Sequence, residues 1–164
     1  MHYISESTPF FQLDSDRTDI ALKDAAVAII TIDDEALVMQ LRDTFPKLLF
    51  PGYWGFFGGA LETGESPFDG LRRELREELA IDVTTATYFT AVDYDFSFCG
   101  RGWFKRHYFI VPLERRQLGD IRLGEGAGWR EMSIRDVLAE PKVVPFDHWA
   151  LWLYANRHSL ANGN

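Results

Sequence analysis

The stretch GGALETGESPFDGLRRELREELAI (residues 58–81) contains the most strongly signalled helix of the chain. Ser66 is followed by Pro67, and Asp69 stands three residues after the serine, which is the pattern of a capped helix start. Apolar residues then recur every three or four positions, at Phe68, Leu71, Leu75 and Leu79. This period predicts a helix that buries one apolar face against the core of an α/β protein.

Three carboxylates, those of Glu74, Glu77 and Glu78, lie beside this apolar face, within an arc of about 100° of the expected helix. Like charges at this spacing repel each other and destabilise the ionised form. A divalent cation such as Mg²⁺ or Mn²⁺, which prefers oxygen ligands, would reverse that effect. The alternative is a solvated helix face on which Arg73 pairs with Glu77, and the helix alone does not decide between the two.

The spacing of residues through the whole stretch is more specific than the helix. Gly59 is followed after five residues by Glu65, and after seven more by Arg73-Glu74-Leu75; one residue later comes Glu77-Glu78, and after another Ala80-Ile81. This pattern resembles the signature box of the Nudix hydrolases and departs from it only at Ala80, where the family has glycine. Helices often close with a residue of positive φ, which alanine tolerates poorly. We therefore expect the helix to end differently here.

The resemblance covers roughly residues 24–155 and implies a Nudix-type α/β/α sandwich with a mixed central sheet. We expect a single domain over residues 1–164, in which residues 1–24 form an N-terminal arm or lead-in strand. Apolar and alternating segments predict strands at 25–31, 36–42, 54–59, 86–98, 103–113 and 128–133. A short helix at 133–139 and a terminal helix at 146–158 follow, the latter with four residues expected to pack inward: Trp149, Leu151, Trp152 and Leu153.

The composition limits the class of partner. Twenty-five acidic residues against 17 basic ones argue against a nucleic-acid polymer, whose phosphates are bound by Lys and Arg. No apolar run approaches the ~18 residues of a membrane span, so no membrane partner is expected. The single cysteine, Cys99, excludes an internal disulfide and is typical of a reducing compartment, which predicts a cytoplasmic protein. The sequence does not fix the oligomeric state, and a homodimer stays open.

The Nudix resemblance implies cleavage of a nucleoside diphosphate linked to another moiety, by attack of water on a phosphorus atom. It assigns the metal, Mg²⁺ or Mn²⁺, to the three helix carboxylates and the carbonyl of Gly58, and leaves the general base open between Glu74 and Glu77. Arg73 and Glu65 would pair and fix the loop against the helix. Gly58 and Gly59 would let the strand approach the metal closely. Glu125, in LGEGAGW, is a candidate fourth ligand or base; an exposed turn is the alternative.

Residues for the remainder of the substrate are less well marked. The cationic candidates are Arg42, Arg106 and His107, which could meet phosphate, and the aromatic candidates are Tyr53 and Trp54, which could stack on a base or sugar. The proline and tyrosine that accompany ADP-ribose and dinucleoside polyphosphate cleavage in the family are absent. A nucleotide sugar or a modified nucleoside triphosphate is therefore the expected substrate.

Two other classes of protein share this fold. A nucleotide-binding module of the Nudix fold would not need the full set of carboxylates. An isomerase of the isopentenyl diphosphate type would require a catalytic cysteine in the site, and Cys99 is the only cysteine of the chain. The intact box of carboxylates argues against the binding module, and the context of Cys99, DFSFCGRG, is not an obviously suitable one for a catalytic cysteine, so a hydrolase is expected.

Overall fold

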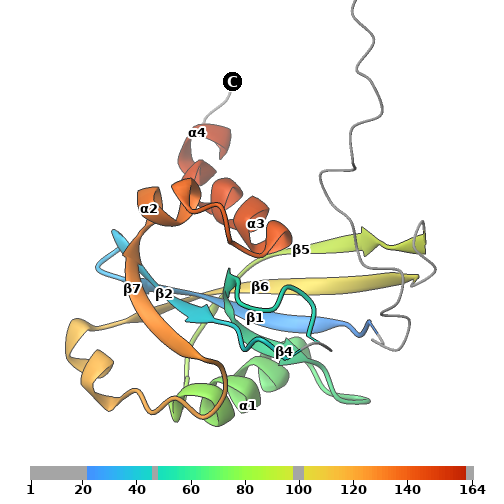
Figure 1. The fold of residues 1–164 in the computed structure, drawn as a ribbon, viewed down its shortest axis with the longest axis horizontal. Helices are drawn as coiled ribbons and strands as arrows, with labels where there is room; N and C mark the ends of the chain where they lie inside the picture. The colour runs from blue at the N-terminus through green and yellow to red at the C-terminus, as the bar shows by residue number, and fades with distance from the viewer. Residues whose placement is uncertain (1–21, 46–47, 98–101, 162–164) are drawn as a thin grey trace, which may run out of the picture.

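Strand β1 (Ala25–Ile32) runs through the centre of a seven-stranded mixed sheet (Figure 1). The structure, a computed structural model, describes residues 22–45, 48–97 and 102–161. Cys99 and all but the last three residues of the expected N-terminal arm lie outside these ranges. All eight residues of β1 are buried, and alternate side chains enter opposite cores: Ala26 and Ile30 face one helix layer, and Val27 and Ile29 face the other. A strand covered on both faces explains the continuous apolar run AAVAIITI.

The strand order is β3 (Trp54–Gly55), β2 (Ala36–Leu41), β1, β6 (Trp103–Leu113) and β5 (Thr87–Asp95). β1 and β6 are parallel, and the other pairs are antiparallel. β4 (Phe57–Ala60) and β7 (Gly128–Ser133) add to β1 and β2. One edge of β1 is thus shared, because β4 pairs with its first half and β2 with its end. β2 and β4 therefore separate from each other, and the candidate site lies between them.

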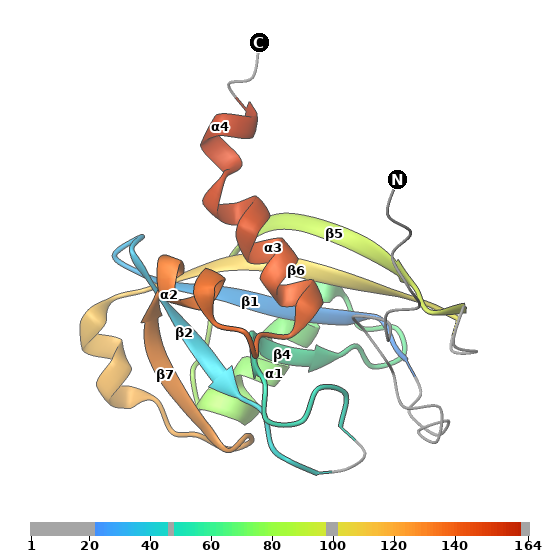
Figure 2. The ribbon, with the colours of Figure 1, turned by 45° about the horizontal axis from the view of Figure 1, so that its top comes forward.

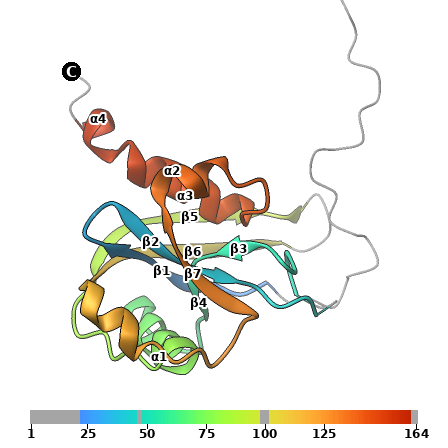
Figure 3. The same cartoon turned by 60° about the vertical axis from the view of Figure 1, so that its left-hand side comes forward.

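Helices cover both faces of the sheet (Figure 3), as the expected α/β/α sandwich requires. α1 (Pro67–Leu79) packs on one face; α2 (Ile134–Ala139) and α3 (Pro145–Ala155) lie on the other, and α4 (Arg157–Ala161) follows α3 (Figure 2). A 3₁₀ helix, η2 (Arg115–Asp120), follows β6 and was not expected. None of the helices in the described part of the chain is long and apolar enough to cross a membrane.

Both ends of α1 are closed by local hydrogen bonds. The Ser66 hydroxyl accepts a bond from the Asp69 N–H (3.2 Å), so the predicted cap is present. At the other end Ala80 adopts the left-handed conformation (φ 57°), and its N–H donates to the carbonyls of Leu75 and Arg76. The expectation of a different helix end is therefore wrong: alanine takes the conformation of the glycine it replaces, at a cost of about 1 kcal/mol.

The expected strand at 54–59 is divided in two. Trp54 and Gly55 pair with β2, whereas the chain from Phe57 onward pairs with β1. Between them the Phe56 N–H leaves the sheet and donates to the Asp147 carboxylate (3.0 Å). A side chain of α3 thus takes up the backbone group that the change of partner strand leaves unpaired.

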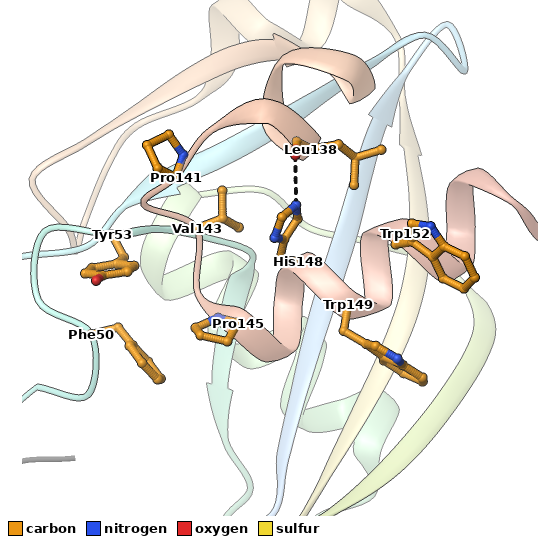
Figure 4. Close-up of a pocket in the computed structure, with 9 residues that line it drawn as sticks. All are labelled: Phe50, Tyr53, Leu138, Pro141, Val143, Pro145, His148, Trp149 and Trp152. Atoms are coloured by element: carbon orange, nitrogen blue, oxygen red, sulfur yellow. Dashed lines mark hydrogen bonds between the residues drawn. The ribbon is translucent and has the colours of Figure 1, made fainter. Parts of the chain in front are cut away.

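The prediction for the terminal helix is wrong at its two tryptophans. Leu151 is fully buried, but Trp149 and Trp152 are 45% and 50% exposed and lie on the outer side of α3, beside a groove (Figure 4). The buried stripe is instead formed by Phe146, Asp147, Ala150, Leu151 and Tyr154. Because this helix is apolar almost all round, its sequence does not show which side faces the sheet.

Candidate functional site

A hollow of about 220 Å³ lies where β2, β4, α1 and the loop before β7 meet. The ends of β2 and β4 form two of its walls because these strands separate along β1. The third wall is α1, and the loop closes the fourth side. Polar and glycine residues dominate the lining: Gln40, Arg42, Asp43, Gly58, Gly59, Glu74, Glu78, Glu125 and Gly126.

Glu78 is the most buried carboxylate of the hollow, with 6% of its surface exposed. One carboxylate oxygen accepts a bond from the Gly58 N–H (2.7 Å), and the other accepts one from the Gln40 side-chain amide (3.0 Å). Burial raises the pKa of Glu78 to about 7, although both hydrogen bonds favour the ionised form. A charge in this position is therefore costly unless a proton or a cation accompanies it.

The two glycines of β4 allow the strand to approach the helix. Gly58 has φ 118°, and a Cβ there would collide with the carbonyl of Ala26 on β1. A Cβ on Gly59 would lie 2.6 Å from the carboxyl carbon of Glu74. Burial raises the pKa of Glu74 as well, with smaller contributions from the charges of neighbouring glutamates. Two carboxyl groups of raised pKa thus lie against the strand end.

Arg73 holds the outer side of the carboxylate edge. Its guanidinium makes the expected pair with Glu65 through two bonds of 3.0 Å each. It also donates to Glu74 (2.7 Å), Glu77 (3.3 Å) and the carbonyl of Ala60 (3.0 Å). The bonds with Glu65 raise the pKa of Arg73, and those from Arg73 lower the pKa of Glu65. Glu77 is 54% exposed and, unlike Glu74 and Glu78, does not line the hollow; the structure shows it in the i,i+4 pair with Arg73 that was considered as the alternative to a metal-binding edge.

Glu125 enters the hollow from the loop before β7. The Gly124 N–H donates to the carbonyl of Glu78 at the end of α1 (2.7 Å), and the Gln40 amide approaches the carbonyl of Glu125 (3.4 Å). These bonds fix the loop to α1 and β2. The structure therefore brings Glu125 to the same hollow as Glu74 and Glu78, although 47 residues separate it from the end of the helical carboxylates (125 − 78).

The donor set of this hollow suits a hard divalent cation. As the side chains stand, no three His, Cys, Asp or Glu residues of the described ranges converge on one point that could hold a metal ion. The carboxylates of Glu74, Glu78 and Glu125 nevertheless line one hollow, and two of them have a raised pKa that a cation would lower. Oxygen ligands of this kind fit Mg²⁺ or Mn²⁺.

A second hollow, of about 210 Å³, adjoins the first and shares Arg42 and the backbone of residues 58–60 with it. Its lining differs in character, with two cationic and two aromatic side chains from β6, α3 and the N-terminal lead-in: Lys23, Arg106, Phe104 and Phe146. Arg42 donates through Nε to the carbonyl of Leu49 (3.1 Å), and burial lowers its pKa. We refer to the two adjoining hollows together as the cleft, the first being its acidic half and the second its aromatic, basic half.

The model of the NUDIX domain family matches residues 22–153. This chain belongs to the Nudix family. It is 51% identical over 81 residues to an 8-oxo-dGTP diphosphatase of Proteus vulgaris, a match over 44% of this chain and 66% of the relative. It is 58% identical over 51 residues to the nucleoside triphosphatase NudI of Escherichia fergusonii, over 31% and 35% of the two chains. The chain thus spans less than two thirds of the length of these relatives.

Among solved structures, the Nudix chain resembles the E. coli ORF135 protein with a TM-score of 0.66 and 25% identity, over 87% of this chain and 96% of the other. A MutT protein from Methanosarcina mazei Go1 gives a TM-score of 0.70 at 15% identity, over 85% and 97%. At 15% identity, the likeness to the Methanosarcina mazei protein concerns the fold alone. Together they agree with the α/β/α sandwich described above.

Three of the expected substrate residues of this Nudix chain line neither half of the cleft. Tyr53 lines the separate groove beside α3. The Trp54 ring packs under the guanidinium of Arg130, at 5.1 Å. His107 points to the other side of β6 from Arg106, and its Nδ1 lies 3.2 Å from the Tyr88 hydroxyl. Of the five expected substrate residues, Arg42 and Arg106 are the two that line the same hollow.

Sequence reasoning missed other residues of the Nudix cleft. Gln40 is a polar residue in an otherwise apolar strand, ALVMQL, and this irregularity was a usable signal. Phe104 shares a face of β6 with Arg106, so strand alternation could have found it. Phe146 comes from α3 and carries no local signal, since only the packing of that helix brings it to the cleft.

Proposed function

We propose that this Nudix chain hydrolyses a phosphoanhydride bond of nucleoside triphosphates, including modified ones, with Mg²⁺ or Mn²⁺. The observation that carries the proposal is that the two hollows adjoin and share Arg42 and residues 58–60 in their linings. One half offers oxygen ligands for a cation, and the other offers aromatic surface and cationic groups for a base and phosphates. The names of the two relatives, a diphosphatase and a nucleoside triphosphatase, agree with this substrate class.

Each side chain then has a role that follows from its place. Glu74 and Glu78 would hold the cation with the Gly58 carbonyl, and Glu77 would bind it from the rim, directly or through water. The cation, when bound, would supply positive charge to the phosphate oxygens. Arg73 orients Glu74 by its 2.7 Å bond and is itself fixed by Glu65. Arg42, at the junction of the hollows, would bind a phosphate of the substrate.

The proton of the attacking water needs an acceptor. Glu74 and Glu125 both line the hollow, and burial brings the pKa of Glu74 closer to neutrality, where a general base works best. We infer that one of these two carboxylates takes the proton. Phe104 and Phe146, which line the second hollow, would contact the base.

The two alternative classes find less support. A binding module would have no need of three carboxylates around one hollow. An isomerase would place a cysteine there, and Cys99, the single cysteine of the chain, lies outside the described residues, so the support for hydrolysis rests on the carboxylates. The geometry therefore favours hydrolysis.

The test is a product analysis in ¹⁸O-labelled water with Mg²⁺. The panel contains nucleoside triphosphates, 8-oxo-dGTP, nucleotide sugars, ADP-ribose and dinucleoside polyphosphates. We expect a nucleoside monophosphate and pyrophosphate, with the label in one of them, because water attacks phosphorus. Label in a released sugar, or turnover that EDTA leaves unchanged, would contradict the proposal. So would the absence of turnover on every member of the panel.

A further inference from the structure

Gln40 is the one polar residue of β2, in ALVMQL, and it lies in the wall of the acidic half of the cleft. Only 5% of its surface is exposed, although the rest of the strand is apolar. A buried amide is stable only when its polar atoms are paired with other polar atoms. The partners of this side chain therefore indicate what it does in the site.

The side-chain amide of Gln40 contacts two parts of the site at once. Its nitrogen, Nε2, donates to Oε1 of Glu78 (3.0 Å) and lies 3.4 Å from the backbone carbonyl of Glu125. An amide nitrogen carries two hydrogens, one for each of these acceptors. Glu78 is 38 residues from Gln40 in the chain and Glu125 is 85 residues from it. One uncharged group thus joins β2, α1 and the loop before β7.

The carboxylate of Glu78 is held between the two strands that separate along β1. Gln40 on β2 donates to one oxygen, and the Gly58 N–H on β4 donates to the other (2.7 Å). Neither donor carries a charge. An arginine or lysine in place of Gln40 would neutralise the carboxylate, as Arg106 does for Asp147 (3.0 Å). The amide instead fixes the orientation of the carboxylate and leaves its charge available for a cation.

The loop that carries Glu125 is shaped to lie against Gln40. Gly126 has φ 96°, and a Cβ there would lie 3.0 Å from Nε2 of Gln40. A Cβ on Gly124 would collide with the backbone carbonyl of Glu77 on α1. Glycine at both positions lets the loop approach β2 and α1 closely, with Glu125 between the two contacts. A side chain at either glycine would disturb the approach of Glu125 to the Gln40 amide.

We propose that Gln40 is a positioning residue, which fixes the carboxylate of Glu78 and the loop of Glu125 in the relation that a cation site requires. The inference rests on the proposed function, in which Glu78 holds Mg²⁺ or Mn²⁺. Gln40 lines the acidic half of the cleft and not the aromatic half. Its loss should therefore weaken the binding of the cation and leave the binding of the base unchanged.

The first measurement is the binding of Mg²⁺ to the full chain without substrate, by titration calorimetry. Gln40→Met keeps the length of the side chain and removes its donor. We expect this variant to bind Mg²⁺ at least ~10-fold more weakly than the wild type, as the loss of a group that orients a metal ligand does. Gln117→Met is the matched control: the Gln117 side chain also pairs with a backbone group, the Glu114 N–H (2.8 Å), but lies on η2, outside the cleft. The control should bind Mg²⁺ as the wild type does.

Two further readouts separate positioning from a general loss of stability. In turnover assays, Gln40→Met should raise the Mg²⁺ concentration for half-maximal rate, while the KM for the nucleotide at saturating Mg²⁺ stays near the wild-type value. In the metal-free protein, amide hydrogen exchange at residues 122–127 should be faster than in the wild type. Gln40→Asn, whose amide is one methylene too short to reach both acceptors, should act in the same direction and provides the test if Gln40→Met does not fold.

Circular dichroism establishes that each variant is folded. A folded Gln40→Met or Gln40→Asn chain with wild-type Mg²⁺ affinity, or with wild-type exchange in the loop, would overturn the inference and leave the proposed function intact. An equal loss of Mg²⁺ affinity in Gln117→Met would also overturn it, because the loss would then follow from stability alone. A wild type that binds no Mg²⁺ and hydrolyses no nucleotide would contradict the proposed function, and this inference with it.

Discussion

α1 and α3 cover opposite faces of one sheet and differ in what they carry. α1 has a narrow leucine stripe and an edge of carboxylates, whereas α3 is apolar on its inner and outer sides. Each helix nevertheless buries one acid, Glu78 on α1 and Asp147 on α3. Each of these acids accepts a backbone N–H from the same short segment, Glu78 from Gly58 and Asp147 from Phe56.

The two acids differ in whether a cationic side chain pairs with them. Arg106 pairs with Asp147 and lies over the ring of Phe146 at 4.8 Å, so this acid is neutralised within the protein. Glu78 forms no ion pair with any residue in the described ranges, and its pKa is raised by burial. A buried acid with its own cation serves stability, whereas one without a cation retains the capacity to bind a proton or a metal. The predictions below test this contrast.

The largest effect is expected for Glu78→Gln. The amide keeps the size of the side chain and can still accept the Gly58 N–H, but it removes the charge that a cation needs. Turnover should fall by ~10³-fold or more, equivalent to about 4 kcal/mol, in a steady-state assay with Mg²⁺. Asp136→Asn, an exposed acid on α2, is the control and should keep full turnover. Turnover near the wild-type level in Glu78→Gln would remove this residue from the mechanism.

The second prediction concerns the acid of α3. Asp147→Asn leaves Arg106 buried beside a neutral group and should lower the free energy of unfolding by ~3–5 kcal/mol, measured by urea denaturation. Glu131→Gln, which breaks an exposed pair with Arg115 at 2.9 Å, should cost less than ~1 kcal/mol. Equal losses in the two variants would refute the structural role given to Asp147.

The third prediction follows from the pKa of Glu78. Its pKa is about 7 in the folded chain and 4.5 by reference, so between these values the folded chain keeps a proton that the unfolded chain has released. The metal-free protein should therefore lose stability as the pH rises through this window, by on the order of 2 kcal/mol from this group. Urea titrations in EDTA at both ends of the window measure the loss. The loss should be smaller in Glu78→Gln, where the contribution of Glu74 remains, and should be reduced by Mg²⁺; an identical pH dependence in wild type and variant would contradict the assignment.

The smallest effect is expected at the end of α1. Ala80 is left-handed, so Ala80→Gly should raise the free energy of unfolding by about 0.5–1 kcal/mol, visible as a higher melting temperature. Ala155, the last residue of α3, is exposed and helical, so Ala155→Gly should act in the opposite direction. A loss of stability in both variants would show that Ala80 is not strained.

The sequence predicted what is encoded locally. The cap at Ser66, the leucine period and the spacing of the glutamates all lie within 24 residues (58–81), so α1 and its carboxylates could be placed without knowledge of the rest of the chain. The hairpin of β1 and β2 was similarly local, with Asp33 and Asp34 both at positive φ in its turn.

What the sequence could not give depends on contacts between distant segments. Phe104 and Phe146 meet in the cleft although 42 residues separate them (146 − 104), and the ring contact between them is 5.9 Å. The outward position of Trp149 follows from which side of α3 meets the sheet, and an almost wholly apolar helix does not show this. The division of the strand at 54–59 depends on Asp147, which lies 91 residues away from Phe56.

β2 and β4 share one edge of β1, and the cleft beside them is built from separate parts of the chain. This arrangement bears on how the substrate of such a protein could change in evolution. Two of the three carboxylates that line the acidic half, Glu74 and Glu78, come from one helix, while the two aromatic side chains of the other half come from β6 and α3. Under the proposed function, substitutions at Phe104 or Phe146 would change the choice of base without altering the carboxylates. The proposed function would then place the residues of the reaction and the residues of base selection on separate parts of the chain, so that a new substrate could be acquired while the reaction is retained.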